Sequence, residues 1–172
     1  MRFILLSLTF FSLMLPPVSA NEKAVTKQTE RRSGKVVGVI DGDTYDVLVE
    51  GRSIRVRMEG IDAPERGMPH YKAAKQYLSA LCYGKQITLV STGKDHHKRT
   101  LGFAFLTDGK ELSREMLKAG YAWHYKKYNS DPTLAQLEVV ARQNRRGLWA
   151  ESMPMPPWEH RAIKRKGKSK RR

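Results

Sequence analysis

The chain has 172 residues and carries 32 Lys and Arg residues against 17 Asp and Glu residues, a formal net charge of +15. Its length suits one compact domain with appendages, and its 40% of hydrophobic residues can form a core, which excludes collagen-like and wholly disordered chains. The single cysteine, Cys82, excludes an internal disulfide framework and a cysteine-based zinc site.

The first 20 residues have the parts of a secretory signal peptide. Arg2 supplies the positive start, residues 3–15 carry no charge, and Val18, Ser19 and Ala20 precede a cleavage site. The apolar run is shorter than the ~20 residues that span a bilayer comfortably. We therefore expect cleavage after Ala20 and a secreted or periplasmic chain with no transmembrane helix in its mature form. An uncleaved anchor is the alternative.

The next segment, residues 21–33, is polar and predicts a linker. Three short runs of alternating or β-branched residues follow it, separated by turn signals, and predict strands at 35–40, 44–49 and 52–58. In the third run Arg57 alternates with apolar residues. Its side chain is therefore expected to point away from the core.

The following part of the chain predicts helices around two more strands. A helix is expected at 69–83, strands at 85–90 and 99–106, and helices at 111–118 and 132–146. Five strands with a helix between the third and fourth follow the plan of an OB-fold, a small closed barrel. We therefore predict an α+β domain at residues 34–159, a five-stranded OB-fold barrel with about three helices. The sequence does not fix the oligomeric state, and a monomer is the default expectation.

Residues 160–172 form a basic tail with eight Lys and Arg residues and no acidic residue. Such a run repels itself and has few apolar positions to bury, so we expect it to be disordered in isolation. Its expected partner is an anionic surface, for which nucleic acid, an acidic cell envelope and anionic lipid are all candidates. A merely solubilising tail is the plainer alternative.

Two short acidic segments, residues 41–43 and 62–65, flank the second and third predicted strands. If residues 50–51 form a tight antiparallel turn, Thr44 lies opposite Arg57. This register brings both acidic segments to the same end of the hairpin. A longer turn would shift the register by a residue or two and would still bring the segments together.

Carboxylates gathered in this way repel one another unless a cation lies among them, and oxygen ligands favour a hard ion such as Ca²⁺, Mg²⁺ or Mn²⁺. Asp43 and Asp62 are the expected ligands, and the backbone carbonyl of Ala63 is a candidate for a third oxygen. The alternative is that each segment is an ordinary polar turn. The presence of both segments around Arg57 favours the metal site.

A hard cation beside arginines suits chemistry at a phosphodiester, because guanidinium groups bind phosphoryl oxygens in pairs and stabilise the charge that develops there. Arg57 and Arg99 are the candidates for this role. Glu65, three residues beyond Asp62, is placed to activate an attacking water as a general base. Each of these residues taken alone could also be an ordinary surface charge.

Several motifs recur in an order that resembles the thermonuclease (staphylococcal nuclease-like) family over roughly residues 34–149. The motifs are Val39-Ile40-Asp41-Gly42-Asp43-Thr44, then Arg57, then Asp62-Ala63-Pro64-Glu65, then Arg99-Thr100-Leu101. The resemblance implies an OB-fold and a Ca²⁺-dependent endonuclease, a phosphodiesterase with one ion per chain. Such an enzyme acts on both DNA and RNA and leaves 3′-phosphate ends.

The resemblance also implies a role for each matching residue. It makes Asp43 and Asp62 calcium ligands, Asp41 a supporting carboxylate, Glu65 the residue that activates water, and Arg57 and Arg99 the groups that hold the phosphate and the transition state. Ala63 stands where the best-known member has Thr, which matters little if that position contributes only its carbonyl oxygen.

Four further residues are candidates for contacts with nucleic acid: His97, Lys98, Tyr125 and Tyr128. His97 and Lys98 stand where the family usually has a Tyr and a Gly, so this loop is expected to differ. The two tyrosines could stack on bases, at about 1–3 kcal/mol per base, although aromatic residues after a helix more often pack against the core. A barrel that only binds nucleic acid, without cutting it, is the alternative function.

Overall fold

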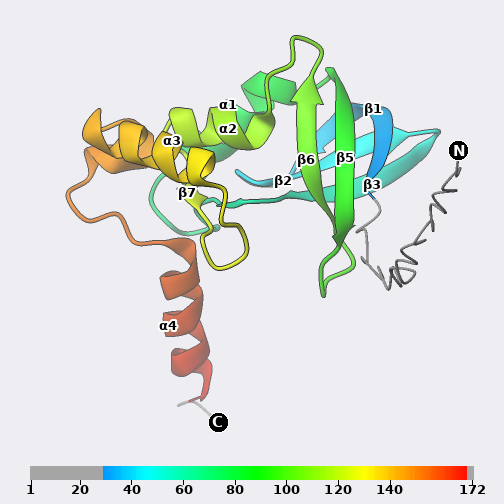
Figure 1. Ribbon diagram of the computed structural model, residues 1–172. Helices are drawn as coiled ribbons and strands as arrows, with labels where there is room; N and C mark the ends of the chain where they lie inside the picture. The colour runs from blue at the N-terminus through cyan, green and yellow to red at the C-terminus, as the bar shows by residue number, and fades with distance from the viewer. Residues whose placement is uncertain (1–28, 170–172) are drawn as a thin grey trace, which may run out of the picture.

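The computed structural model describes residues 29–169. The predicted signal peptide, residues 21–28 and the last three residues of the basic tail lie outside this range. Five strands form a closed barrel in the order β1, β2, β3, β6 and β5 (Figure 1). Their bounds are β1 Glu30–Val39, β2 Thr44–Val49, β3 Arg52–Met58, β5 Gln86–Lys94 and β6 Thr100–Leu106. The predicted five-stranded α+β barrel is confirmed.

The β2–β3 hairpin has the predicted register, with Thr44 opposite Arg57 and Val49 opposite Arg52. Its turn consists of Glu50 and Gly51, which both adopt positive φ angles, 49° and 77°. This is the backbone of a tight two-residue hairpin turn, whose twist matches that of the flanking strands. The turn therefore fixes which residues meet at the opposite end of the hairpin.

Parallel pairing of β3 with β6, from Val56 opposite Thr100 to Met58 opposite Gly102, closes the barrel. On the other side, β1 pairs with β5 from Glu30 opposite Ser91 onward. Residues 30–33, which we expected in the linker, therefore belong to β1. Their backbone groups pair with those of β5. The polar side chains of this segment gave no sign that it would form a strand.

Within the described residues, four α-helices lie outside the barrel, whereas the sequence predicted about three. They are α1 Tyr71–Cys82, α2 Leu112–Lys118, α3 Pro132–Gln143 and α4 Pro157–Ser169, with a short 3₁₀ helix, η1, at Gly147–Ala150. The start of α3 is capped by Asp131, whose Oδ1 accepts a hydrogen bond of 2.8 Å from the Thr133 amide. Pro132 suits the first helical turn, where no amide donor is needed.

The main core fills the barrel and the space beneath α1 and α2. Tyr45, Leu78, Leu89 and Leu112 are among its most buried side chains. Cys82 is also buried, and burial raises the pKa of its thiol to about 12. A second, smaller cluster under α3 contains Trp123, Ala141, Leu148 and Trp149, with Trp158 packed against it.

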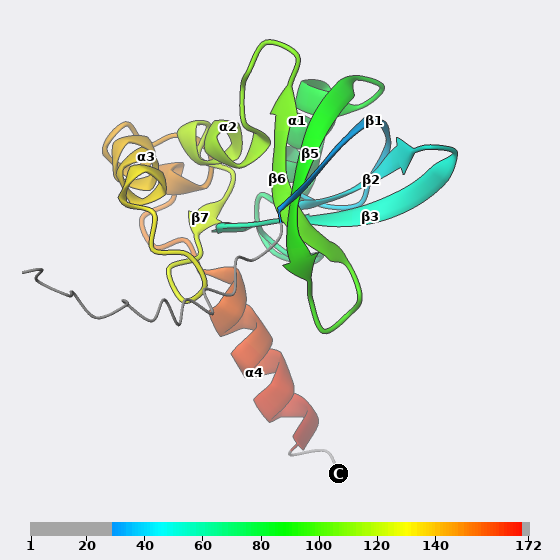
Figure 2. The ribbon, with the colours of Figure 1, turned by 45° about the vertical axis from the view of Figure 1, so that its right-hand side comes forward.

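Outside the barrel, β4 (Ile61–Asp62) pairs with β7 (Trp123–His124), so that Asp62 lies opposite Trp123. The two views in Figures 1 and 2 show α4 projecting away from the barrel from a point close to β7. This helix includes residues 160–169, for which we expected disorder. Its first turns are held by the contacts of Trp158 and Arg161 with the body of the protein. No helix within residues 29–169 is long and apolar enough to cross a membrane.

Candidate active site

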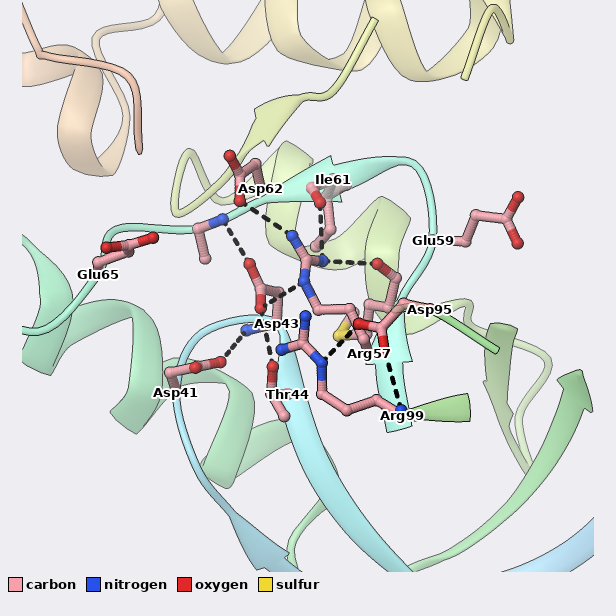
Figure 3. A network of polar contacts seen from close by, with 12 residues as sticks. Asp41, Asp43, Thr44, Arg57, Glu59, Ile61, Asp62, Glu65, Asp95 and Arg99 are labelled. Atoms are coloured by element: carbon pink, nitrogen blue, oxygen red, sulfur yellow. Dashed lines mark hydrogen bonds and ion pairs between the residues drawn. The ribbon is translucent and has the colours of Figure 1, made fainter. Parts of the chain in front are cut away.

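Asp43 joins the two acidic segments in space. It directly precedes β2, and its Oδ2 accepts a hydrogen bond of 2.7 Å from the amide of Ala63 in the second segment. Its Oδ1 accepts from the Thr44 hydroxyl at 3.0 Å and lies 3.1 Å from Arg57 Nε. The predicted convergence of the two segments is therefore present, and Figure 3 shows Asp43 between Asp41 and Asp62.

Arg57, near the end of β3, is held by four groups. Its Nε contacts Asp43 at 3.1 Å and its Nη2 donates to Asp62 Oδ1 at 2.9 Å. Its Nη1 donates to the carbonyls of Met58 and Ile61 at 2.7 and 2.9 Å. Its side chain is only 12% exposed, so this guanidinium is fixed between two buried carboxylates before any substrate arrives.

Burial and mutual repulsion act on the acidic residues of the site. Burial, with the nearby charge of Asp43, raises the pKa of Asp62, although the hydrogen bond from Arg161 opposes the shift. Burial and the charge of Asp43 also raise the pKa of Asp41 to about 6. Asp41 supports the first segment directly, because its Oδ1 accepts a hydrogen bond from the Asp43 amide at 3.1 Å.

Arg99 approaches the same place from the loop between β5 and β6. Asp95 holds it, with Oδ2 2.7 Å from Arg99 Nε and Oδ1 accepting from the amides of His97 and Arg99, both at 2.9 Å. Figure 3 shows the Arg99 guanidinium turned toward Asp43. The sequence did not single out Asp95, because an acidic residue in a polar loop carries no signal of its own.

A groove of about 1220 Å³ runs across this region, and we call it the central groove. Nearly all the predicted site residues line it: Asp41, Asp43, Arg57, Asp62, Ala63, Glu65, His97, Arg99, Tyr125 and Tyr128. Lys98 is the exception, since it is absent from the lining and lies exposed in the loop with a φ of 62°. The groove therefore combines carboxylates, guanidinium groups and aromatic rings on one surface.

Aromatic side chains form one part of the groove. Tyr125 stacks on Trp158 of α4, with 5.5 Å between ring centroids and 3° between planes. Tyr128 meets Tyr125 edge-on at 4.8 Å and is 67% exposed. Tyr128 therefore leaves most of its surface open to solvent, whereas one face of Tyr125 is covered by Trp158.

The sequence reasoning missed Arg161, which enters the groove from α4. Its Nη2 lies 2.7 Å from Asp62 Oδ2, and its Nη1 donates to Asp62 Oδ1 at 3.3 Å and to Glu65 Oε1 at 2.8 Å. Partial burial lowers the pKa of Arg161, but the bonds to Asp62 and Glu65 outweigh it and the net shift is upward. Arg161 lies in the segment assigned to the basic tail, and no local pattern distinguishes it from its neighbours.

The donor set fits a hard divalent cation in its chemistry, since Asp43, Asp62 and Glu65 offer only carboxylate oxygens. The guanidinium of Arg161 already places a positive charge at two of them. In the present arrangement, no three His, Cys, Asp or Glu side chains of residues 29–169 converge as a set of metal ligands. Arginine contacts engage the carboxylates instead.

Comparison with known proteins adds a family match over the same region. The family described as "Staphylococcal nuclease homologue" matches residues 55–151. The chain is 39% identical over 125 residues to an "Uncharacterized endonuclease" of Escherichia coli O157:H7, covering 73% of this chain and 82% of the relative. It is 37% identical over 139 residues to a "Micrococcal nuclease" of Shigella flexneri, covering 74% and 79%. It is 42% identical over 119 residues to a "Probable staphylococcal-like nuclease CAN1" of Oryza sativa subsp. japonica, covering 69% and 36%.

Proposed function

The chain belongs to the staphylococcal nuclease family, and from this membership we propose an exported endonuclease that depends on Ca²⁺, with one ion per chain. Its substrates are DNA and RNA, and its products carry 3′-phosphate ends. The observation that carries the proposal is the position of Arg57, fixed between Asp43 and Asp62 in the central groove. This arrangement is suited to a phosphodiester, which brings negative charge to a site that has guanidinium donors in place.

The two arginines have different capacities to bind phosphate. Four hydrogen bonds or ion-pair contacts engage the Arg57 donors. Arg99 is bound through Nε to Asp95, and no hydrogen bond within the described chain engages its two Nη groups. Arg99 therefore has a free pair of donors for two phosphoryl oxygens, while Arg57 provides a fixed positive charge at the carboxylates.

The acidic residues divide the remaining work. Asp43 and Asp62, with the carbonyl of Ala63, would hold Ca²⁺, and Asp41 supports Asp43 through its amide. The bound ion supplies a Lewis acid that polarises a phosphoryl oxygen. Glu65 is partly exposed at the edge of the groove, where a water molecule can reach it, and it takes the proton as that water attacks phosphorus. The bond from phosphorus to the 5′ oxygen breaks, the 5′ oxygen takes a proton from solvent, and the phosphate stays on the 3′ oxygen.

Digestion of plasmid DNA and of RNA tests the proposal. Parallel reactions contain Ca²⁺, Mg²⁺ or excess chelator, and end-group analysis identifies the products. We expect cleavage of both substrates with Ca²⁺, none with chelator, and 3′-phosphate ends. Full cleavage in chelator would contradict the assignment, as would full activity of an Asp43→Ala, Asp62→Ala double variant. Binding without cleavage under every divalent ion would favour the alternative, a nucleic-acid-binding barrel that is not an enzyme.

Export and assembly are tested separately. Export is supported by the composition of residues 1–20, which lie outside the described residues. Amino-terminal sequencing of the protein recovered from the periplasm or the medium should begin at Asn21. Light scattering coupled to size-exclusion chromatography should give the mass of a monomer.

A further inference from the structure

Arg161 binds two residues of the proposed catalytic apparatus at once. Its guanidinium spans Asp62, with one nitrogen near each carboxylate oxygen at 2.7 and 3.3 Å, and reaches Glu65 at 2.8 Å. Asp62 is one of the proposed metal ligands, and Glu65 is the proposed water-activating residue. Arg161 is therefore the only arginine in residues 29–169 that contacts both of these carboxylates.

These contacts and a metal ion exclude one another. Arg161 lies at both oxygens of Asp62, so a divalent cation that bound either oxygen at short range would have to share it with this guanidinium. Arg57 and Arg161 already place two positive charges at Asp62, whose side chain is 2% exposed, so both would repel a divalent ion added beside them. Arg57 contacts Asp62 through Oδ1 alone, so Arg161 is the group that occupies Oδ2.

The position of α4 makes the contact reversible. The helix touches the groove through its first turns, where Trp158 stacks on Tyr125 and Arg161 reaches Asp62. Beyond them Lys164, Arg165 and Lys166 are exposed. The Arg161 side chain itself is 36% exposed and can turn away into solvent without unpacking a core.

We propose that Arg161 is a built-in counter-cation at Asp62, one of the proposed metal ligands, and must be displaced from it before a divalent ion binds. The proposal rests on the proposed function for the identity of the ion, Ca²⁺. In the metal-free chain Arg161 neutralises Asp62 and Glu65. Ca²⁺ removes it from both, frees Glu65 for water, and leaves the guanidinium at the groove, where a phosphate can bind it.

Calorimetric titration of the full chain with Ca²⁺ alone, without nucleic acid, tests the competition. Arg161→Gln should bind Ca²⁺ about tenfold more tightly than wild type, because the ion no longer has to break charge-assisted hydrogen bonds. Lys164→Gln is the matched control: it removes the same charge from the same helix, one turn nearer the carboxyl end, at an exposed position. Its affinity should stay within about twofold of wild type, since a surface charge is screened.

Thermal unfolding gives a second measurement that needs no activity. Ca²⁺ should raise the Tm of Arg161→Gln more than that of wild type, because stabilisation grows with affinity at a fixed concentration. Equal affinities for wild type and Arg161→Gln, or weaker binding by the variant, would overturn the proposal. The proposal would also fail if neither wild type nor Arg161→Gln bound Ca²⁺, because Arg161 would then have no ion to compete with.

The digestion assay separates this inference from the proposed function. If Arg161→Gln binds Ca²⁺ more tightly but neither protein cleaves nucleic acid, the competition is supported and the nuclease assignment fails. If both proteins cleave and their Ca²⁺ affinities are the same, the nuclease assignment stands and the competition fails.

Discussion

Arg57 and Arg99 line the same groove, but their partners differ in burial. Replacing either with Gln should lower kcat by about 10²-fold or more, the scale of losing one group that stabilises charge in the transition state. Arg57→Gln should also lower the free energy of unfolding by about 3 kcal/mol, because it leaves buried Asp43 and Asp62 short of a partner. Arg99→Gln should cost about 1 kcal/mol or less, since its pair with Asp95 is partly exposed.

Single-turnover kinetics and urea unfolding measure the two effects. Arg55→Gln is the control, because Arg55 lies on the same strand, pairs with Asp46 and is 52% exposed. Both its kcat and its stability should remain close to those of wild type. Unchanged stability of Arg57→Gln would contradict the buried ion pairs of Arg57 with Asp43 and Asp62.

Asp95 predicts a pH dependence of stability. Burial raises the pKa of Asp95, but its hydrogen bonds from Arg99 and His97 lower it more, so the net shift is downward. A lowered carboxyl pKa stabilises the fold above the ordinary pKa near 3.9, and this contribution is lost as the pH falls through the folded value. Asp95→Asn should therefore lower the free energy of unfolding by about 1 kcal/mol at pH 7.

The same variant should differ less from wild type at pH 3, because Asp95 is then mostly protonated in the unfolded chain, which lowers the stability that the charged carboxylate contributes to the fold. Urea unfolding at the two pH values checks this. A difference that is equal at pH 7 and pH 3 would mean that charge plays no part in holding Arg99.

Local rules account for the residues that the sequence placed correctly, and long-range packing accounts for the others. The alternation in β3 and the turn at residues 50–51 are enough to bring Asp43 and Arg57 together. Arg161 lies 99 residues from Asp62 and 96 from Glu65 along the chain. No periodicity connects such distant positions, so only the path of the chain after α3 reveals the contact.

At the scale of elements, the barrel depends on a close approach at Gly102. This residue lies between β3 and β5, opposite Met58 and Ser91. A Cβ atom added there would stand 2.4 Å from the Val90 carbonyl oxygen, which belongs to the backbone and cannot move aside cheaply. Gly102→Ala should therefore lower the free energy of unfolding by about 2 kcal/mol or more.

Gly38→Ala is the matched control on β1, because a Cβ there meets only the Asp46 side chain at 3.6 Å, an ordinary contact. Its stability should be within about 0.5 kcal/mol of wild type. Chemical denaturation measures the free energy of unfolding of both variants and of wild type. If the two variants had equal stability, the barrel would not be tight at Gly102.

Two elements differ from expectation for the same reason, which is tertiary contact. The polar segment 30–33 becomes strand because β5 offers it backbone partners. The basic segment in α4 becomes helix although its charges repel, because Trp158 and Arg161 fix its first turns. In both cases composition describes the isolated segment, whereas the structure depends on what lies beside it.

At the scale of the whole molecule, the positive charge of α4 should strengthen the attraction to nucleic acid. Replacing Lys164, Arg165 and Lys166 with Gln should reduce the slope of log Kd against log salt by about 2 to 3, at about 0.9 for each phosphate that the helix no longer neutralises. Fluorescence anisotropy with a short DNA duplex in chelator measures binding without cleavage.

The control triple variant replaces Lys35, Lys72 and Lys85 with Gln, and none of these residues lines the central groove. It removes the same number of charges, so its salt slope should stay close to that of wild type. Equal slopes for the two triple variants would mean that α4 does not contact the duplex.

Cys82 has a practical consequence for the whole molecule. It is the one cysteine of the chain, it is fully buried, and its thiol resists ionisation. The thiolate is the form that attacks alkylating dyes, so we expect the folded protein to react very slowly with maleimides and iodoacetamides. In a Lys164→Cys variant the label should therefore attach at position 164 alone. A fluorophore there would report the movement of α4 without signal from a second labelled site.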